Sequence, residues 1–350
     1  MKLFQIIFIL INYVNIISFK NIILLNNINK KNVLFLNHKP DYKEKQNNVE
    51  KKYFKNNIIE KFQSLYILIR PNNIIPTTLL SITGGWIMNP SIQKLLSSTS
   101  FIISIINTVL IMSSSMVIND IFDIPIDKIN SLDRPLVNGK ITKIEASLFA
   151  LTLIGLTEYL TYFYLPDNLK LIIQLAIIQI CIYTPILKKI LFIKNISCAA
   201  LVAFSLFFSG ISTTTHLIDY NKNLGILSIS MSLIFFGSLC NEVLLDIRDK
   251  EGDRKNNIIT IPVVFGNDFS LVFANVILYF NLISNSLSIM YLYNSIDKAL
   301  IIPVIFSPLI VNINKIKKAN FSEESIINYM KYSNYPLIII LIYICKISVL

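Results

Sequence analysis

Long apolar segments recur along the chain after residue 70, and short polar stretches separate them. Each segment is long enough, or nearly so, to cross a hydrocarbon core about 30 Å thick. Backbone polar groups in lipid must be satisfied within the segment, so the pattern predicts an all-α integral membrane fold, a bundle of nine transmembrane helices. The predicted spans are 73–93, 99–121, 144–165, 170–187, 196–216, 224–245, 268–292, 299–314 and 333–350.

Composition and charge support a multi-pass membrane protein. Of the 350 residues, 53% are hydrophobic and 15% are charged, and a soluble domain of this length needs more charge to cover its surface. The formal net charge is +11, but the basic residues lie mostly near the amino terminus and in short loops. We therefore expect contact with membrane lipids and anionic ligands, and no nucleic-acid partner.

The first 60 residues differ from the rest of the chain. Residues 1–19 carry one Lys before an apolar run, as in a secretory signal peptide. Residues 20–60 contain nine Lys, ten Asn and only four acids, too polar a tract to pack a core. A signal-like segment followed by a basic, Asn-rich tract resembles the leader that directs proteins to the apicoplast, the secondary plastid of apicomplexan parasites. We therefore predict leader segments at 1–19 and 20–60, a membrane domain at 61–350, and a plastid membrane location. The mitochondrial inner membrane and the endoplasmic reticulum are alternatives.

Acidic side chains are concentrated where the second and sixth predicted spans end. Both places have the pattern D-x-x-D-x-x-x-D, and its offsets of 0, 3 and 7 fall within an arc of roughly 60° on a helix. Pro125 interrupts the first copy, so Asp127 is also compatible with a turn after the helix. The first acidic motif is Asn119, Asp120, Asp123 and Asp127, and the second acidic motif is Asp246, Asp249 and Asp253.

The two acidic motifs predict a metal-diphosphate site. Carboxylates at the membrane boundary of an apolar helix are costly and usually functional, and two facing clusters need cations. Mg²⁺ prefers carboxylate oxygens and commonly bridges to phosphate oxygens. Basic residues beside the acids would complete a cradle for a diphosphate. The best-placed candidates are Arg134, Lys140, Lys188 and Arg254.

These motifs resemble the UbiA superfamily of intramembrane prenyltransferases. The first motif continues into Asp133-Arg134-Pro135, the second into Gly252-Asp253-Arg254, and Arg70-Pro71 is similar to a common family start. A third family signature is a Tyr followed closely by a Lys. Tyr183 and Lys188 are similar to it, although they are five residues apart where the family usually has four. The resemblance covers residues 65–350.

The resemblance implies nine helices around a central cavity, with Mg²⁺ held over the diphosphate of a polyprenyl diphosphate. It implies catalysis by Asp123, Asp127, Asp249 and Asp253, and diphosphate contacts from Tyr183 and the basic candidates. The metal ligands that it implies are Asn119, Asp123, Asp127, Asp246, Asp249 and Asp253. The enzyme would transfer an alkyl or aryl group other than methyl, here a prenyl group, to a lipophilic acceptor and release diphosphate.

The acceptor is open at the level of sequence. The run Glu251-Gly-Asp-Arg is more similar to the branch of chlorophyll synthases, homogentisate prenyltransferases and geranylgeranylglyceryl phosphate prenyltransferases than to the 4-hydroxybenzoate branch. An aromatic quinone precursor and a glycerol phosphate are both compatible with it. A polytopic secondary transporter is the alternative from another class, but transporters place ionisable residues near the bilayer midplane.

Overall fold

The computed structural model describes residues 59–130, 133–213 and 222–349. The predicted leader falls almost entirely outside these residues. Within the described ranges the regular structure is helical throughout. The longer helices are α3 (Ile74–Met88), α5 (Thr99–Phe122), α7 (Lys143–Tyr164), α8 (Asp167–Tyr183), α9 (Ile193–Ile211), α10 (Lys222–Lys255), α11 (Ile261–Tyr293), α12 (Ile296–Lys318) and α13 (Glu323–Ile347).

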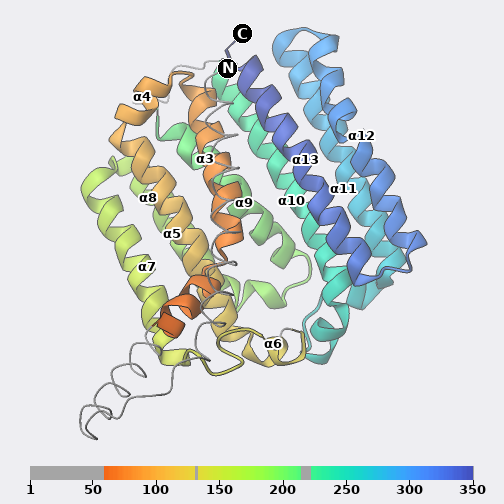
Figure 1. Ribbon diagram of the computed structural model, residues 1–350. Coiled ribbons are helices and arrows are strands. Elements are labelled where there is room, and N and C mark those ends of the chain that lie inside the picture. Colours follow the sequence, from red (N-terminus) through yellow and green to blue (C-terminus); the bar gives the residue numbers. More distant parts are fainter. Residues whose placement is uncertain (1–58, 131–132, 214–221, 350) are drawn as a thin grey trace, which may run out of the picture. The chain divides into compact units, whose positions relative to one another are not determined.

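The shorter elements lie between these helices. They are the 3₁₀ turns η2 (Pro71–Asn73) and η3 (Leu187–Lys189) and the helices α4 (Ile92–Ser97) and α6 (Ile124–Asn130). Figure 1 shows the long helices side by side as a bundle, with α6 at its lower end. Helix α6 and the last turns of α10 lie close together at this end.

Each of the nine predicted spans overlaps one of the long helices in the described residues. Six of these helices are long and apolar enough to cross a membrane: α5, α7, α9, α10, α11 and α12. The all-helical, multi-pass membrane fold is therefore confirmed, while the count of nine spans stays a prediction. The largest difference in length is in α10, which continues to Lys255, ten residues beyond the predicted end.

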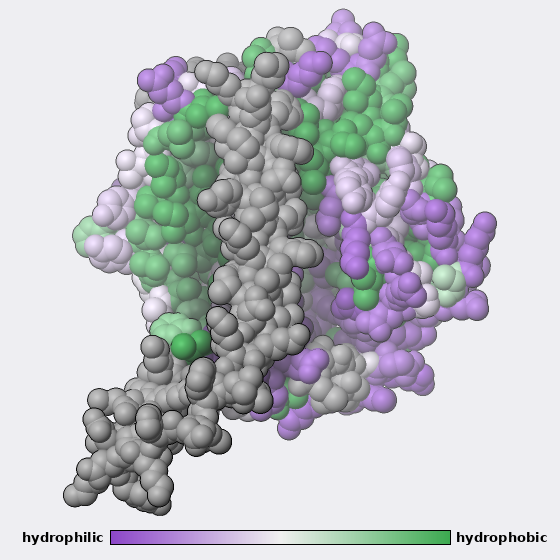
Figure 2. Space-filling model, in the orientation of Figure 1, coloured by the Kyte–Doolittle hydropathy of each residue, from purple (hydrophilic) through white to green (hydrophobic). Residues whose placement is uncertain are grey.

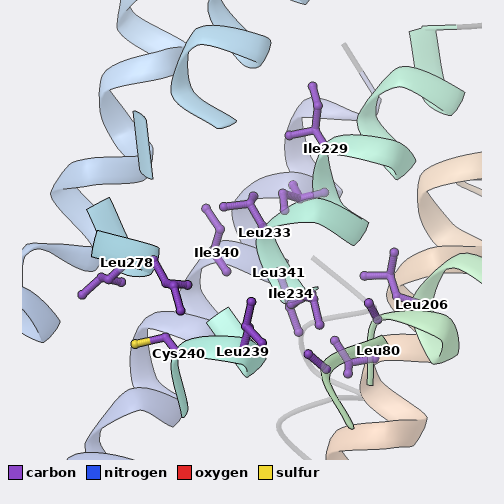
Figure 3. Packing of buried hydrophobic residues seen from close by; sticks show 14 of the residues in the cluster. Leu80, Leu206, Ile229, Leu233, Ile234, Leu239, Cys240, Leu278, Ile340 and Leu341 are labelled. Atoms are coloured by element: carbon purple, nitrogen blue, oxygen red, sulfur yellow. The ribbon is translucent and has the colours of Figure 1, made fainter. Parts of the chain in front are cut away.

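The core is continuous through the middle of the bundle. Figure 3 shows part of it, with Leu80 of α3, Leu206 of α9, Leu233 of α10, Leu278 of α11 and Ile340 of α13 packed together. A smaller cluster under the loop before α7 includes Leu68, Val117, Leu136 and Ile141. This second cluster anchors the segment that carries Arg134 to the end of α5.

Helix α7 lies at the outside of the bundle. In its most apolar 18-residue window 22% of the residues are buried, against 50% in α5. An apolar helix with so little protein around it is typical of a helix that faces lipid. Figure 2 shows apolar residues over this left flank, whereas hydrophilic residues gather at the lower right.

Close approach of α3 and α9 depends on glycine, as is common where membrane helices pack tightly. A Cβ atom on Gly84 would lie 1.9 Å from the carbonyl oxygen of Leu206, and one on Gly85 would lie 2.1 Å from the ring of Phe101. No other residue type fits at these two positions without a shift of the backbone or the ring. The contact matters for the site because Arg70 precedes α3 and Lys194 lies in the first turn of α9.

Candidate active site

The first acidic motif is divided between two helices. Helix α5 ends at Phe122, and Asp123 follows with φ −85° and ψ 4°. Helix α6 begins at Ile124, with Pro125 in its first turn. Proline has no backbone N–H and its ring clashes with the preceding turn, so it cannot continue α5. Asp127 consequently lies beyond the end of α5, as the second of the two placements required, but on the short helix α6 and not on a turn.

Three cations bind the acids of the first motif. Asp120 is 3% exposed and accepts hydrogen bonds from Arg70 Nη2 at 2.8 Å and Arg134 Nη1 at 2.5 Å. The Lys188 ammonium donates to Asp123 Oδ1 at 2.5 Å, and Asn119 Nδ2 donates to Asp123 Oδ2 at 2.7 Å. Buried carboxylates need such partners, because an unpaired buried charge costs several kcal/mol. Asp120 and Asp123 are therefore each held by a positive group.

Asp127 is the acid of this motif with the weakest pairing. Its Oδ2 lies 3.8 Å from Arg134 Nε, beyond hydrogen-bonding distance. The pKa of Asp127 is raised to about 6, mainly by burial and in part by the negative charges of Asp120 and Asp123, while Arg134 acts to lower it. The metal-free site thus disfavours a negative charge at Asp127, and a divalent cation nearby would favour it.

The second acidic motif lies on one unbroken helix. Helix α10 passes through all three acids before it ends at Lys255. Asp246 and Asp253 are 2% and 4% exposed. The Lys194 ammonium lies 2.6 Å from Asp246 Oδ1 and 3.5 Å from Asp253 Oδ2. Asp249 is half-buried and accepts hydrogen bonds from the neighbouring Arg248 at 2.7 and 2.8 Å.

Two contacts bring the motifs together. Helix α6, which carries Asp127, packs against α10. Lys188, which binds Asp123, also lies close enough to Asp253 for their charges to interact. Figure 1 shows that α6 and the end of α10 share the lower end of the bundle. The structure thus places the two acidic motifs, separated by more than a hundred residues, at one site.

The residues predicted to bind the diphosphate differ in their contacts. Lys188 and Arg134 contact the first motif, as described above. Among the described residues, Lys140 and Arg254 pair with no acid of either motif: Lys140 lies 3.6 Å from Glu60 near the surface, and Arg254 is exposed at the end of α10. Tyr183 accepts a hydrogen bond from the Cys198 thiol at 3.0 Å.

Arg70, Lys194 and Asn195 also belong to the site, although they are not among the residues predicted for it. Arg70 donates to Asp120, while Lys194 and Asn195 both bind Asp246. A usable signal was present for Lys194, since a lysine at the start of an apolar run needs a negative partner. Its partner is more than 50 residues away along the chain, so the pairing itself needs the fold.

The oxygen donors fit Mg²⁺ but form no closed cage. Among the described residues, no three His, Cys, Asp or Glu side chains gather as they would around one ion. Mg²⁺ is usually held by one or two carboxylates, with waters and substrate phosphates completing its shell. Two carboxylate clusters at one site match that requirement. The predicted donors are Asn119, Asp123, Asp127, Asp246, Asp249 and Asp253.

Residues 75–334 match the UbiA prenyltransferase family, and this chain belongs to that family. It is therefore a membrane prenyltransferase, and the alternative of a secondary transporter is set aside. A relative from Methanosphaera stadtmanae, named digeranylgeranylglyceryl phosphate synthase, is 31% identical over 228 residues, which cover 65% of this chain and 79% of that protein.

Two solved structures share the fold. One comes from work on a digeranylgeranylglyceryl phosphate synthase in membranes, with a TM-score of 0.61, 26% identity, and coverage of 83% of this chain and 99% of that one. The other is a UbiA homologue from Archaeoglobus fulgidus bound to DMAPP and Mg²⁺, with a TM-score of 0.58, 19% identity, and coverage of 82% and 99%. The predicted family, prenyl diphosphate donor and Mg²⁺ cofactor agree with these findings.

Proposed function

We propose that this protein transfers a geranylgeranyl group from its diphosphate to the free hydroxyl of geranylgeranylglyceryl phosphate within a membrane. The observation that carries the reaction type is the meeting of two acidic motifs, with the cations that pair with them, at one end of an apolar bundle. The acceptor rests on the relatives, because the first matched proteins are named for digeranylgeranylglyceryl phosphate synthesis. The glycerol phosphate thus replaces the aromatic quinone precursor as the preferred acceptor.

The chemistry requires that the bond between C1 of the prenyl chain and the diphosphate oxygen breaks and that the acceptor oxygen bonds to C1. Diphosphate leaves with its electron pair, and the hydroxyl proton is released. Arg134 and Lys188 lie where their charges would neutralise the leaving group. Bound Mg²⁺ would add Lewis-acid neutralisation, held by the six donors named above. The apolar bundle would keep water from the allylic cation.

The first experiment is an in vitro assay of membranes that contain the protein. The donor would be radiolabelled geranylgeranyl diphosphate, with Mg²⁺ or EDTA. The acceptors would be geranylgeranylglyceryl phosphate, homogentisate, 4-hydroxybenzoate and a chlorophyllide-like alcohol. We expect Mg²⁺-dependent labelling of geranylgeranylglyceryl phosphate alone. Labelling of an aromatic acceptor instead would contradict the proposed substrate but leave the reaction type intact.

We also propose that residues 1–60 direct the protein to a plastid of the apicoplast type and that the domain at 61–350 crosses the membrane nine times. The support for the location is the signal-like segment and the basic, Asn-rich tract in the sequence. The support for nine spans is the overlap of each predicted span with a long helix of the described residues. A fluorescent protein fused to residues 1–60 tests the location, and mitochondrial or reticular fluorescence would contradict it.

A further inference from the structure

Lys194 lies at a position that disfavours a lysine in two ways. It is in the first turn of α9, and the partial positive charge of a helix amino terminus disfavours a cation there. The N-cap residue of α9 is Phe192, which has a φ of 67° and whose side chain accepts no hydrogen bond from the first turn. Lys194 is also only 9% exposed. Lys194 thus departs from two preferences: that cations avoid helix amino termini and that lysines are exposed. Such a departure is expected at a functional site.

The ion pairs that compensate this cost come from the second acidic motif. The ammonium lies between Asp246 and Asp253, which are two helical turns apart on the same face of α10. Asn195, the next residue, donates to the second oxygen of Asp246 at 2.8 Å. Both carboxylate oxygens of Asp246 therefore already have a protein partner. Lys194 and Asn195 leave Asp249 and one oxygen of Asp253. Asp249 accepts two hydrogen bonds from Arg248, but this arginine is its exposed neighbour on the same helix and not a buried cation like Lys194.

We propose that Lys194 is the resident cation of the second acidic motif, a positioning residue that fixes Asp246 and Asp253 and leaves Asp249 and Asp253 as the metal-facing donors. This inference rests on the proposed function and narrows its set of metal ligands. A lysine ammonium is a compact point charge with three donors, so it can bridge two carboxylates much as a metal ion would. The protein thus supplies part of the charge that this motif would otherwise draw from divalent ions.

The proposal predicts how the motif responds when the charge is removed. In Lys194→Met the carboxylates lose their resident cation and repel one another, so the metal-free protein unfolds at a lower temperature. The same carboxylates then attract Mg²⁺ more strongly, since a positive charge within a few ångströms no longer opposes it. We expect Mg²⁺ to bind about tenfold more tightly than in the unchanged protein.

The experiment uses the full chain in detergent, without donor or acceptor, and records the unfolding midpoint against Mg²⁺ concentration. Isothermal titration calorimetry gives the Mg²⁺ affinity of the same samples. Lys189→Met is the matched control, because Lys189 is an exposed lysine in the adjoining η3 turn. Lys194→Gln removes the charge but keeps a donor for Asp246, and it replaces Lys194→Met where that variant does not fold.

A larger Mg²⁺-induced rise in the unfolding midpoint for the Lys194 variants than for the unchanged protein and the Lys189 control would support the proposal. Equal rises, with only a lower midpoint throughout, would mean that Lys194 stabilises the fold and nothing more. An unchanged Mg²⁺ response with a raised KM for the donor would make Lys194 a diphosphate ligand, which also overturns the proposal. Activity of the unchanged protein reports separately on the proposed function.

Discussion

The two acidic motifs share one spacing of aspartates but differ in backbone and in charge. The second motif is displayed on a continuous helix, α10, whereas the first is divided between α5 and α6 at Asp123. Three cations from three different segments, Arg70, Arg134 and Lys188, bind the first motif. The second has one buried cation, Lys194, and a neighbour, Arg248, on the same helix.

This difference shows that a ligand pattern does not fix a coordination geometry. On α10 the three acids keep the common face that helical periodicity gives them. In the first motif Pro125 ends α5, so Asp127 lies on the separate short helix α6, which packs against α10. One motif therefore offers a straight row of oxygens and the other a bent one.

The largest expected effect is the loss of turnover when a proposed metal donor is removed from either motif. We expect Asp123→Ala and Asp249→Ala each to lower kcat by about 10³-fold, because each removes a charge that would help hold Mg²⁺ against the leaving group. The assay above measures the loss, and gel filtration in detergent confirms the fold. Normal activity in either variant would remove that residue from the site.

A second prediction concerns the scaffold that holds the cations of the two motifs in place. Gly84→Ala puts a Cβ against the backbone of Leu206 and pushes α3 away from α9. We expect a loss of about 2 kcal/mol in the free energy of unfolding. Gly155→Ala is the control, because nothing lies within 4 Å of its Cβ position. There the better helix propensity of alanine should leave stability unchanged or raise it by up to about 1 kcal/mol.

A third prediction tests the bend in the first motif directly. Pro125→Ala restores a backbone N–H and permits α5 to continue, which would move Asp127 toward a single helix face as on α10. We expect kcat/KM to fall about tenfold, because small displacements of catalytic groups are costly. Pro262→Ala, in the first turn of α11, is the matched control. If Pro125→Ala is as active as that control, the bend is not needed for catalysis.

The smallest expected effect is a pH dependence of metal binding. The pKa of Asp127 is raised to about 6 in the metal-free protein, above its ordinary value of 3.8. A raised carboxyl pKa adds stability at low pH that is lost as the pH rises through about 6, while a metal needs the ionised form. Mg²⁺ affinity should therefore fall severalfold as the pH falls through about 6. Calorimetry at several pH values measures this fall, and Asp127→Asn should abolish that part of it.

The sequence by itself determined the class of fold and the kind of chemistry. Long apolar segments have only the helix as a solution in lipid, so the helices appear where the pattern predicts them. Repeated aspartates at the ends of two such segments restrict the ligand to a cation and an anion that it binds. These inferences are local, because each depends on residues within a few turns of one another. Even the break at Pro125 was visible as one of two placements for Asp127.

Only the tertiary structure decided which basic side chain pairs with which aspartate. Arg70, Lys188 and Lys194 bind acids that lie 50 or more residues away along the chain. Lys140 and Arg254 were equally plausible from their positions in the sequence, yet the former pairs with Glu60 and the latter is exposed. Ion pairing depends on separations of a few ångströms, and these are set by how α3, α9 and α10 pack, not by distance along the chain.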